Sequence, residues 1–241
     1  MDNSIKISVI GAGRFGSFLG KELSRFYDVI YYDRNNTCKD NRPFKDIYEC
    51  LCRDIIFIAL PISEIENFLN DNCKSISPSS ILVDVASVKL KPKEYYEKYL
   101  PEGNQFILTH PLFGPDSAKL TLEGERITIT ESRISDESEL MLLKIFGEQL
   151  RLKIIYLTAD EHDYLMAYNL SLIHHLGRTF DCMGISDLKL KMKSLTDISR
   201  ITRFVMNDSE QLFSDFYRFN PYSHRIREEF EVSFKKITSL L

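Results

Sequence analysis

Three polar residues in the middle of the chain have side chains and surroundings suited to acid–base chemistry. His110 comes directly after an apolar run, and Pro111 restricts the backbone that follows it. An imidazole has an ordinary pKa of about 6.5, so a neutral ring can accept the proton of an alcohol at about pH 7. Ser87 could orient that imidazole or a substrate hydroxyl, and Lys89 is expected to be a solvated or phosphate-facing charge. The structural alternatives are a turn histidine bonded to the backbone and a serine that caps the following helix.

Further candidates surround a glycine-rich turn near the start of the chain. Gly11, Gly13 and Gly16 follow an apolar run with the spacing Gly-x-Gly-x-x-Gly. Gly11 permits the tight turn, Gly13 lets the backbone approach a pyrophosphate, and Gly16 lets helix and strand pack closely. Asp33 ends the next apolar run, where a carboxylate can bind ribose hydroxyls, while free N–H groups at the helix start bind the phosphates. The pattern predicts an NAD site that contains Gly11, Gly13, Arg14, Phe15, Gly16, Asp33 and Arg34.

Two alternatives accompany this cofactor prediction. Asp33 would repel the 2′-phosphate of NADP, which favours NAD, but the guanidinium of Arg34 could pair with that phosphate, so NADP stays open. The structural alternative is a glycine turn that only packs a helix on a strand and leaves Asp33 solvated.

The elements that must position these residues are short apolar runs that alternate with helical patterns. The expected strands are 5–10, 29–32, 54–60, 80–85, 105–109, 126–130 and 153–157, and the expected helices between them include 62–69, 91–100 and 135–150. This alternation predicts an α/β fold with a doubly wound, mostly parallel, Rossmann-type sheet and helices on both faces. Because ligands bind beyond the carboxyl ends of such strands, Asp33, Ser87 and His110 are expected at one edge of the sheet.

The sequence changes character at Thr158, after which no strand pattern is found. Thr158 and Glu161 form a capping box that opens a long helix, and the last helix is expected from about Pro221. We therefore expect a dinucleotide-binding domain at 1–157 and an all-helical domain at 158–241. The helical part has more aromatic residues than so small a domain would bury alone, which predicts a homodimer formed through it.

The first helix of this region carries residues spaced by three or four positions. They form one stripe: Asp163, Ala167, Leu170 and His174, with Arg178 one turn further. The stripe could line a substrate pocket, but the sequence alone slightly favours charges that face water or cap neighbouring helices. Arg203, on a later helix, could bind a carboxylate through two hydrogen bonds, although most helical arginines pair with surface acids.

Composition limits the class of protein. The chain has 241 residues, 44% of them hydrophobic and 27% charged, with a net charge of −4, which argues against a nucleic-acid partner. No apolar run is long enough to span a membrane and no signal peptide is recognised, so we expect a cytoplasmic protein without a membrane partner. The five cysteines lack zinc or disulfide spacing, no metal site is expected, and Cys50 and Cys52 are interpreted as buried thiols.

Several motifs in this order resemble those of the prephenate and arogenate dehydrogenases of tyrosine biosynthesis. They are Gly11–Gly16, Asp84–Lys89, Thr109–Pro115, Glu161–Asp163 with Ala167, Ile173–Arg178, and Ile201–Arg203 followed by Asn207 and Asp208. The most specific of them is Thr-His-Pro-Leu-Phe-Gly-Pro at 109–115. The resemblance covers residues 5 to about 221 and implies a nucleotide-binding domain followed by a helical dimerisation domain.

The same resemblance implies the reaction and the roles of individual residues. The reaction is an NAD- or NADP-dependent oxidative decarboxylation of prephenate, an oxidation of a CH–CH group; conversion of arogenate to tyrosine is the alternative. His110 corresponds to the catalytic histidine, Ser87 to its polar neighbour, and Arg203 to the arginine that binds the substrate. His174 corresponds to a pocket histidine, and Asp208 to a position where an acid goes with arogenate use in plant members.

Two other classes of protein are weaker alternatives. A β-hydroxyacid-type dehydrogenase would share the first domain but use a lysine on the first helix after it, and no lysine lies between Thr158 and Met183. A non-catalytic nucleotide-binding module would need no histidine at position 110.

Overall fold

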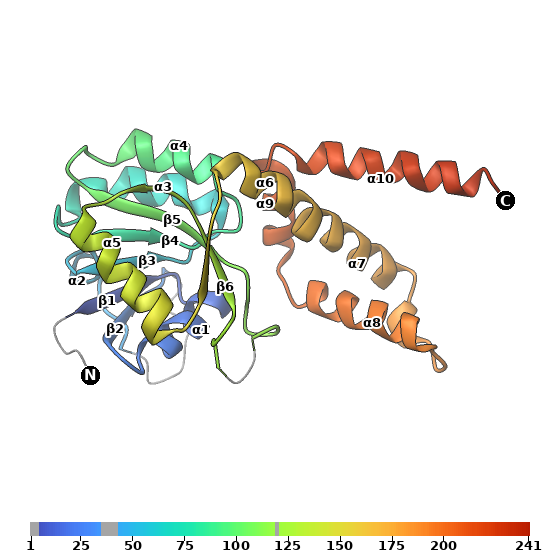
Figure 1. Ribbon diagram of the computed structural model, residues 1–241, viewed down its shortest axis with the longest axis horizontal. Coiled ribbons are helices and arrows are strands. Elements are labelled where there is room, and N and C mark those ends of the chain that lie inside the picture. Colours follow the sequence, from blue (N-terminus) through green and yellow to red (C-terminus); the bar gives the residue numbers. More distant parts are fainter. Residues whose placement is uncertain (1–4, 35–42, 119–120) are drawn as a thin grey trace. The chain divides into compact units, whose positions relative to one another are not determined.

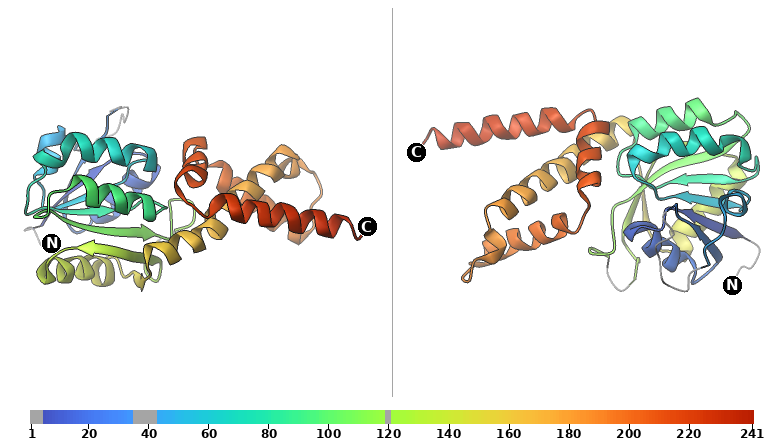
Figure 2. Two further views of the ribbon diagram at one scale, coloured as in Figure 1. Left: turned by 90° about the horizontal axis from the view of Figure 1, so that it is seen from above. Right: turned by 180° about the vertical axis from the view of Figure 1, so that it is seen from behind.

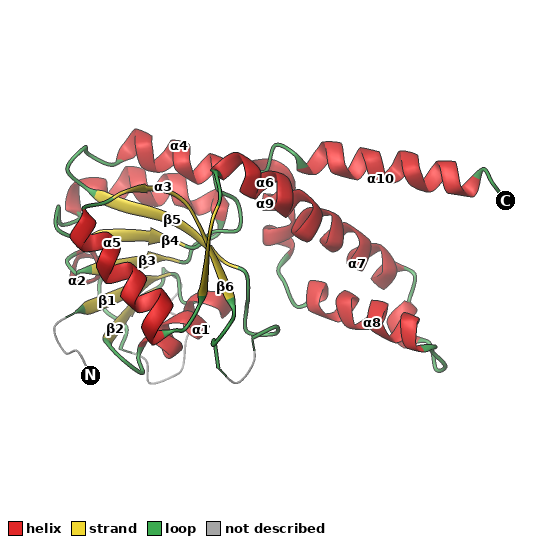
Figure 3. Ribbon diagram, viewed as in Figure 1, coloured by secondary structure: helices red, strands yellow, loops and turns green. Residues whose placement is uncertain are grey.

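The computed structural model describes residues 5–34, 43–118 and 121–241 and divides into two compact units. The first unit ends at Ala159 and the second begins at Asp160. Figure 3 shows strands in the first unit, whereas the second unit consists of helices and their connections. Among the residues described, no helix combines the length and the apolar character that crossing a membrane requires.

The first unit is built on one seven-stranded sheet in the order β2-β1-β3-β4-β5-β6-β7. The strands are β1 (Lys6–Ile10), β2 (Asp28–Tyr32), β3 (Ile55–Ile58), β4 (Ile81–Asp84), β5 (Gln105–Pro111), β6 (Arg126–Arg133) and β7 (Lys153–Tyr156). Neighbouring strands are parallel except for the antiparallel pair β5 and β6. The predicted doubly wound, mostly parallel sheet is therefore confirmed.

Helices cover both faces of this sheet (Figure 1, Figure 2). One face carries α1 (Arg14–Leu23) and α5 (Asp136–Leu143); the other carries α2 (Ile47–Leu51), α3 (Ile62–Asn72) and α4 (Leu90–Tyr99). In β3, Ile55 and Phe57 belong to the core on the α1 side, and the alternate residues Ile56 and Ile58 are also fully buried. Burial on both faces explains why the strands read as continuous apolar runs rather than alternating ones.

The second unit begins with one long helix. It comprises α6 (Ala159–Met166), a π-helical turn at Ala167–Leu172 and α7 (Ile173–Cys182), and is followed by α8 (Lys193–Met206), α9 (Glu210–Phe219) and α10 (Ser223–Thr238). Helices α7 and α8 pack closely, since a Cβ on Gly177 would lie 2.9 Å from Cβ of Val205. Because α6 begins at Ala159, the helix start expected at Thr158 is confirmed to within one residue.

Candidate active site

The glycine turn that follows β1 is shaped by contacts with its neighbours. Gly11 has φ +95°, and a Cβ there would lie 2.4 Å from the carbonyl oxygen of Ala59. A Cβ on Gly16 would lie 1.9 Å from the carbonyl oxygen of Gly11, so both positions require glycine for the fold itself. A Cβ on Gly13, in contrast, would meet no described atom within 4 Å. The turn therefore leaves open space at the one glycine that is expected to face a pyrophosphate.

The start of α1 and Asp33 complete this part of the site. Gly13 is the N-cap of α1 and provides no side chain to bond the N–H groups of the first turn, as a phosphate-binding helix start requires. The N–H of Ala12 donates to Oδ2 of Asp33 at 2.8 Å, which holds the carboxylate against the glycine turn. The alternative of a merely solvated Asp33 is therefore wrong. These residues fit a dinucleotide.

Arg34, which could bind the 2′-phosphate of NADP, is paired with an acid in the structure. Its guanidinium lies 3.4 Å from a carboxylate oxygen of Glu64, in the first turn of α3, and both side chains are exposed. Glu64 is a residue that the sequence did not suggest, because the pair joins positions 30 residues apart. Residues 35–42 lie outside the described residues.

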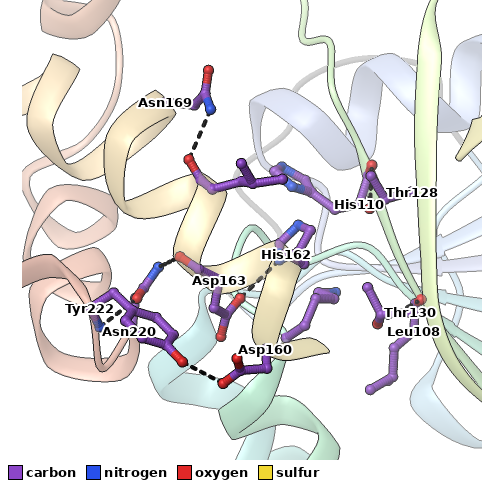
Figure 4. Close-up of polar contacts among 12 residues, drawn as sticks. Leu108, His110, Thr128, Thr130, Asp160, His162, Asp163, Asn169, Asn220 and Tyr222 are labelled. Atoms are coloured by element: carbon purple, nitrogen blue, oxygen red, sulfur yellow. Dashed lines mark hydrogen bonds and ion pairs between the residues drawn. The ribbon is translucent and has the colours of Figure 1, made fainter. Parts of the chain in front are cut away.

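His110 lies at the end of the sheet that carries the glycine turn. It belongs to β5 and is 7% exposed, so it is a strand residue and not the turn histidine that the sequence left open. His110 pairs with Thr128 of β6, and the Thr128 hydroxyl faces the His110 carbonyl oxygen at 3.4 Å (Figure 4). Pairing with β6 thus fixes the backbone from which the imidazole projects.

Lys89 differs from its prediction. Its side chain is fully buried, forms an ion pair with Asp84, and donates from Nζ to the carbonyl oxygen of Thr109 at 2.6 Å. The expectation of a solvated or phosphate-facing charge is therefore wrong. It is based on the exposure of most lysines, and only the fold reveals the buried acid at the end of β4. Lys89 is also the N-cap of α4, so the alternative in which Ser87 caps this helix is wrong. The half-buried Ser87 side chain lies in the connection between β4 and α4.

The loop after His110 is anchored on α1. The ring of Phe113 lies 6.5 Å from the ring of Phe15 and 6.3 Å from that of Phe18, measured between centroids. Arg14 forms a 2.5 Å ion pair with Asp116 in the same loop. Two of the predicted cofactor residues, Arg14 and Phe15, are thus in contact with the segment that carries the histidine.

In the second unit, the predicted stripe is buried but in a different register. Asp163, Ala167 and His174 are buried, whereas the buried residue of the middle turn is Ser171 rather than Leu170. The cause is the π-helical turn, which inserts an extra residue into the helical repeat. The expectation that the charges of this stripe face water is wrong for Asp163 and His174.

Buried polar contacts surround Asp163. Its carboxylate lies 2.8 Å from Nδ1 of the buried His162, and its carbonyl oxygen accepts a 2.7 Å hydrogen bond from the side-chain amide of Asn220 (Figure 4). The hydroxyl of Tyr222 donates to the carboxylate of Asp160 in the same figure. These contacts attach the start of α10 to α6.

His174, Asp208 and Arg178 form a second polar cluster. Nε2 of His174 lies 3.4 Å from Oδ2 of Asp208, and a guanidinium nitrogen of Arg178 donates to the Asp208 carbonyl oxygen at 3.2 Å. The ring of Phe213 stacks on His174, and the Arg178 guanidinium lies 4.7 Å from that ring. Nδ1 of His174 is buried and has no hydrogen-bond partner among the described residues.

Arg203 is the arginine that the sequence proposed as the carboxylate ligand. Its side chain is exposed on α8, and Nε donates at 3.4 Å to the carbonyl oxygen of Ser199 in the same helix. The structure therefore joins His174 to Asp208, whereas the hydrogen bond described for Arg203 is to its own helix. Among the described residues, no group of three or more His, Cys, Asp or Glu side chains is arranged to hold a metal ion.

The predicted pair of buried thiols is half correct. Cys50 is fully buried, and burial raises the pKa of its thiol from 9.0 to about 12. Cys52 is exposed, because α2 ends between the two residues. Cys38 lies outside the described residues.

Comparisons with known proteins identify the family and the fold of this chain. The family model described as "Prephenate dehydrogenase, nucleotide-binding domain" matches residues 29–156, more than half of the chain, and a model described as "TYRAAT1-like, C-terminal domain" matches residues 179–241. The structure of prephenate dehydrogenase from A. aeolicus, solved with hydroxyphenyl propionate and NAD+, superposes with a TM-score of 0.77 at 20% identity, over 99% of this chain and 91% of that one. That likeness confirms the fold class.

Two curated plant proteins align with nearly the whole chain. Arogenate dehydrogenase 2 of Arabidopsis thaliana is 28% identical over 98% of this chain and 69% of its own length. Arogenate dehydrogenase 1 of the same plant is 24% identical over 98% of this chain, which spans 39% of that relative.

Proposed function

Because the chain belongs to the prephenate dehydrogenase family, we propose that it catalyses the NAD-dependent oxidative decarboxylation of prephenate to 4-hydroxyphenylpyruvate in tyrosine biosynthesis. The observation that carries the proposal is the position of His110, buried on β5 at the carboxyl edge of the sheet whose first strand leads into the glycine turn. Such an edge is where a doubly wound sheet binds nucleotide and substrate. The family supports the reaction type, and the site geometry supports the residue roles proposed below.

The cofactor is held by backbone groups and one carboxylate. N–H groups of the first turn of α1 bind the pyrophosphate beside the open face of Gly13, and Asp33 binds the adenosine ribose. The nicotinamide, when bound, supplies the acceptor for the hydride. NADP is the alternative cofactor, in which case Arg34 would leave Glu64 to bind the 2′-phosphate.

His110 acts as the general base. Its neutral ring accepts the proton of the substrate's ring hydroxyl as that carbon is oxidised, and Ser87 orients either the imidazole or the hydroxyl. Burial excludes water from the imidazole, which strengthens its hydrogen bond to the substrate. Loss of the ring carboxylate as CO2 then follows, because the new ketone withdraws electrons and the ring becomes aromatic.

Substrate recognition is assigned to the second unit. Arg203 binds a carboxylate of the substrate, and its exposed side chain, bonded through Nε to the Ser199 carbonyl oxygen of its own helix, presents the guanidinium to solvent. His174 offers Nδ1 as a further polar contact. Both substrates of the family carry carboxylates, so these contacts alone do not select between them.

Arogenate is the second candidate substrate, and Asp208 is the observation that favours it. Its carboxylate is partly exposed and already accepts an interaction from His174, so it could pair with the ammonium group that arogenate has and prephenate lacks. The two plant relatives are named for arogenate. Asp208→Asn is expected to lower the efficiency with arogenate relative to prephenate if Asp208 selects the substrate. Asp197→Asn, on the preceding helix, is the matched control, and an unchanged ratio in Asp208→Asn removes Asp208 as the selector.

The direct test is turnover of the purified chain with four combinations of substrate and cofactor. Prephenate and arogenate are each supplied with NAD+ and NADP+, and the absorbance of the reduced nicotinamide is followed. Turnover with prephenate supports the proposal, turnover with arogenate alone supports the second candidate, and either result identifies the cofactor. Nucleotide binding without turnover would support a non-catalytic module, and oxidation of a β-hydroxyacid in place of both substrates would support that class of dehydrogenase.

We further propose a cytoplasmic homodimer formed through the second unit. Apolar side chains of α10, among them Val232, Phe234 and Ile237, are each more than 60% exposed, as are Leu190 and Met192 before α8. A partner that covers them would remove a substantial apolar surface from water. The four described cysteines are free thiols, as is usual in a reducing compartment. Light scattering is expected to give twice the chain mass, and a monomer at micromolar concentration would contradict the dimer.

A further inference from the structure

The buried ion pair between Lys89 and Asp84 has no role in the chemistry proposed above. A buried lysine is costly unless an acid and further hydrogen-bond acceptors replace the water it loses. Lys89 has both, because Asp84 and the carbonyl oxygen of Thr109 accept from Nζ. Both side chains of the ion pair are fully buried. Such an arrangement is weak support for stability alone, since an apolar pair of similar size often does as well.

The ion pair lies where strand β4 stops pairing with β5, the strand that carries His110. The ladder between β4 and β5 ends at the pair Asp84 and Leu108. Beyond it, β5 continues through Thr109 and His110 with β6 as its partner, and the register shifts between Leu108 and Thr109. On the β4 side, side-chain hydrogen bonds replace those of the β-ladder. Lys89 donates to the Thr109 carbonyl oxygen, and the Thr109 hydroxyl donates to the Asp84 carbonyl oxygen at 2.8 Å.

We propose that Lys89 is a positioning residue for His110, held in place by Asp84. The Thr109 carbonyl belongs to the peptide group whose nitrogen is that of His110, so a bond to this carbonyl fixes the plane from which the imidazole projects. Lys89 therefore restricts the orientation of the general base without touching substrate or cofactor. This inference rests on the proposed function for its kinetic part, but the orientation of His110 can be observed without any substrate.

The first experiment compares two lysines that are two positions apart. Lys89→Met removes the charge and keeps most of the side-chain length, and Lys91→Met is the matched control, because Lys91 is partly exposed and paired with Glu94 on α4. Lys89→Met is expected to lower kcat by roughly 10²-fold, the usual cost of a reacting group displaced by about 1 Å. The nucleotide dissociation constant and KM are expected to stay within about twofold of the parent, and Lys91→Met to leave kcat unchanged.

A second pair of variants separates positioning from stability. Lys89→Met leaves Asp84 as an unpaired buried acid, so Asp84→Asn/Lys89→Met is included to remove both charges and restore a stably folded protein. This double variant is expected to unfold at the parent's temperature within a few degrees and still to show the low kcat. Recovery of the parent's kcat in it would overturn the proposal.

The decisive readout is a cycle with His110→Ala. If Lys89 acts through the imidazole, Lys89→Met has little further effect on kcat once the imidazole is absent, because changes that act on one group are not additive. Losses that multiply in His110→Ala/Lys89→Met would overturn the proposal.

The NMR signals of the histidine rings give a test that needs no activity. The chain has five histidines, and the His110 signal is identified by its loss in His110→Ala. Its chemical shift and titration are expected to change in Lys89→Met and not in Lys91→Met. A parent without turnover would refute the proposed function alone, whereas an unchanged His110 signal in Lys89→Met would refute the positioning role alone.

Discussion

The two units hold their candidate residues in different ways. At the edge of the sheet, Asp33 is bonded to the backbone of Ala12, and His110 is nearly buried on a strand with a neighbour on β6. In the helical unit, Arg203 is exposed and bonded to its own helix, while Asp208 is partly exposed beside His174. In the first group, backbone groups and neighbouring strands hold the candidate residues, whereas in the second the contacts described are mainly between side chains and within helices.

This difference matches what each group is proposed to do. Proton and hydride transfer require reacting atoms at fixed distances, which a sheet edge provides because each strand end is tied to its neighbours. Recognition of a carboxylate tolerates a long side chain that closes on its ligand. We therefore expect substitutions in the first unit to change kcat and substitutions in the second to change KM.

The largest expected effect is at His110. His110→Ala removes the general base and is expected to lower kcat by roughly 10²–10⁴-fold while KM changes little. The parent's kcat is also expected to fall at low pH, since a protonated ring accepts no proton. His224→Ala, an exposed histidine on α10, is the control. Retained activity and an unchanged pH profile in His110→Ala would contradict the mechanism.

Arg203 tests the other side of the comparison. Arg203→Ala removes a charged hydrogen bond to a carboxylate that both substrates share, so KM is expected to rise by about 10- to 100-fold for either, with a smaller change in kcat. Arg200→Ala is the matched control, because Arg200 lies three residues earlier and faces Asp197. If Arg203→Ala lowers kcat and leaves KM unchanged, the expectation that substitutions in the second unit act on KM is wrong.

Cofactor choice is expected to depend on two acids of the first unit. The parent is expected to prefer NAD+, and Asp33→Asn to reduce that preference by about tenfold, because a neutral amide no longer repels a 2′-phosphate. Glu64→Gln releases Arg34 from an exposed ion pair and is expected to improve the efficiency with NADP+ by no more than about fivefold. Glu66→Gln on the same helix is the control. A parent that uses NADP+ better would refute the role of Asp33.

The smallest expected effect concerns stability at alkaline pH. Burial keeps the Cys50 thiol protonated up to a pKa of about 12 in the folded chain, whereas the unfolded thiol ionises near its ordinary 9.0. The unfolded state thus loses its proton first, and the free energy of unfolding is expected to decrease as pH rises from 9.0 toward 12. When it is measured by urea unfolding between about pH 8 and 10, the free energy of unfolding should decrease less steeply with pH in Cys50→Ala than in the parent. Cys52→Ala, at an exposed thiol, should retain the parent's slope.

The sequence by itself determined the fold class and the position of the nucleotide turn. Apolar runs such as the one at Ile55–Ile58 indicate strands buried on both faces, because a run of consecutive apolar residues can be read directly from the chain and is stable only where both faces of the strand are covered. Gly11 and Gly16 are equally readable, since steric exclusion of a Cβ acts over a few ångströms within one strand–turn–helix unit. The proposed cofactor residues follow from that local geometry.

Only the tertiary structure decided which of the polar residues are buried and what they contact. The burial of Lys89 depends on Thr109, 20 positions away. Ser171 is buried in place of Leu170 because of a π-helical turn that the helical repeat does not predict. The pairing of Arg14 with Asp116 joins residues over 100 positions apart. Such contacts depend on how distant elements pack, so the residue types and their spacing along the chain cannot reveal them.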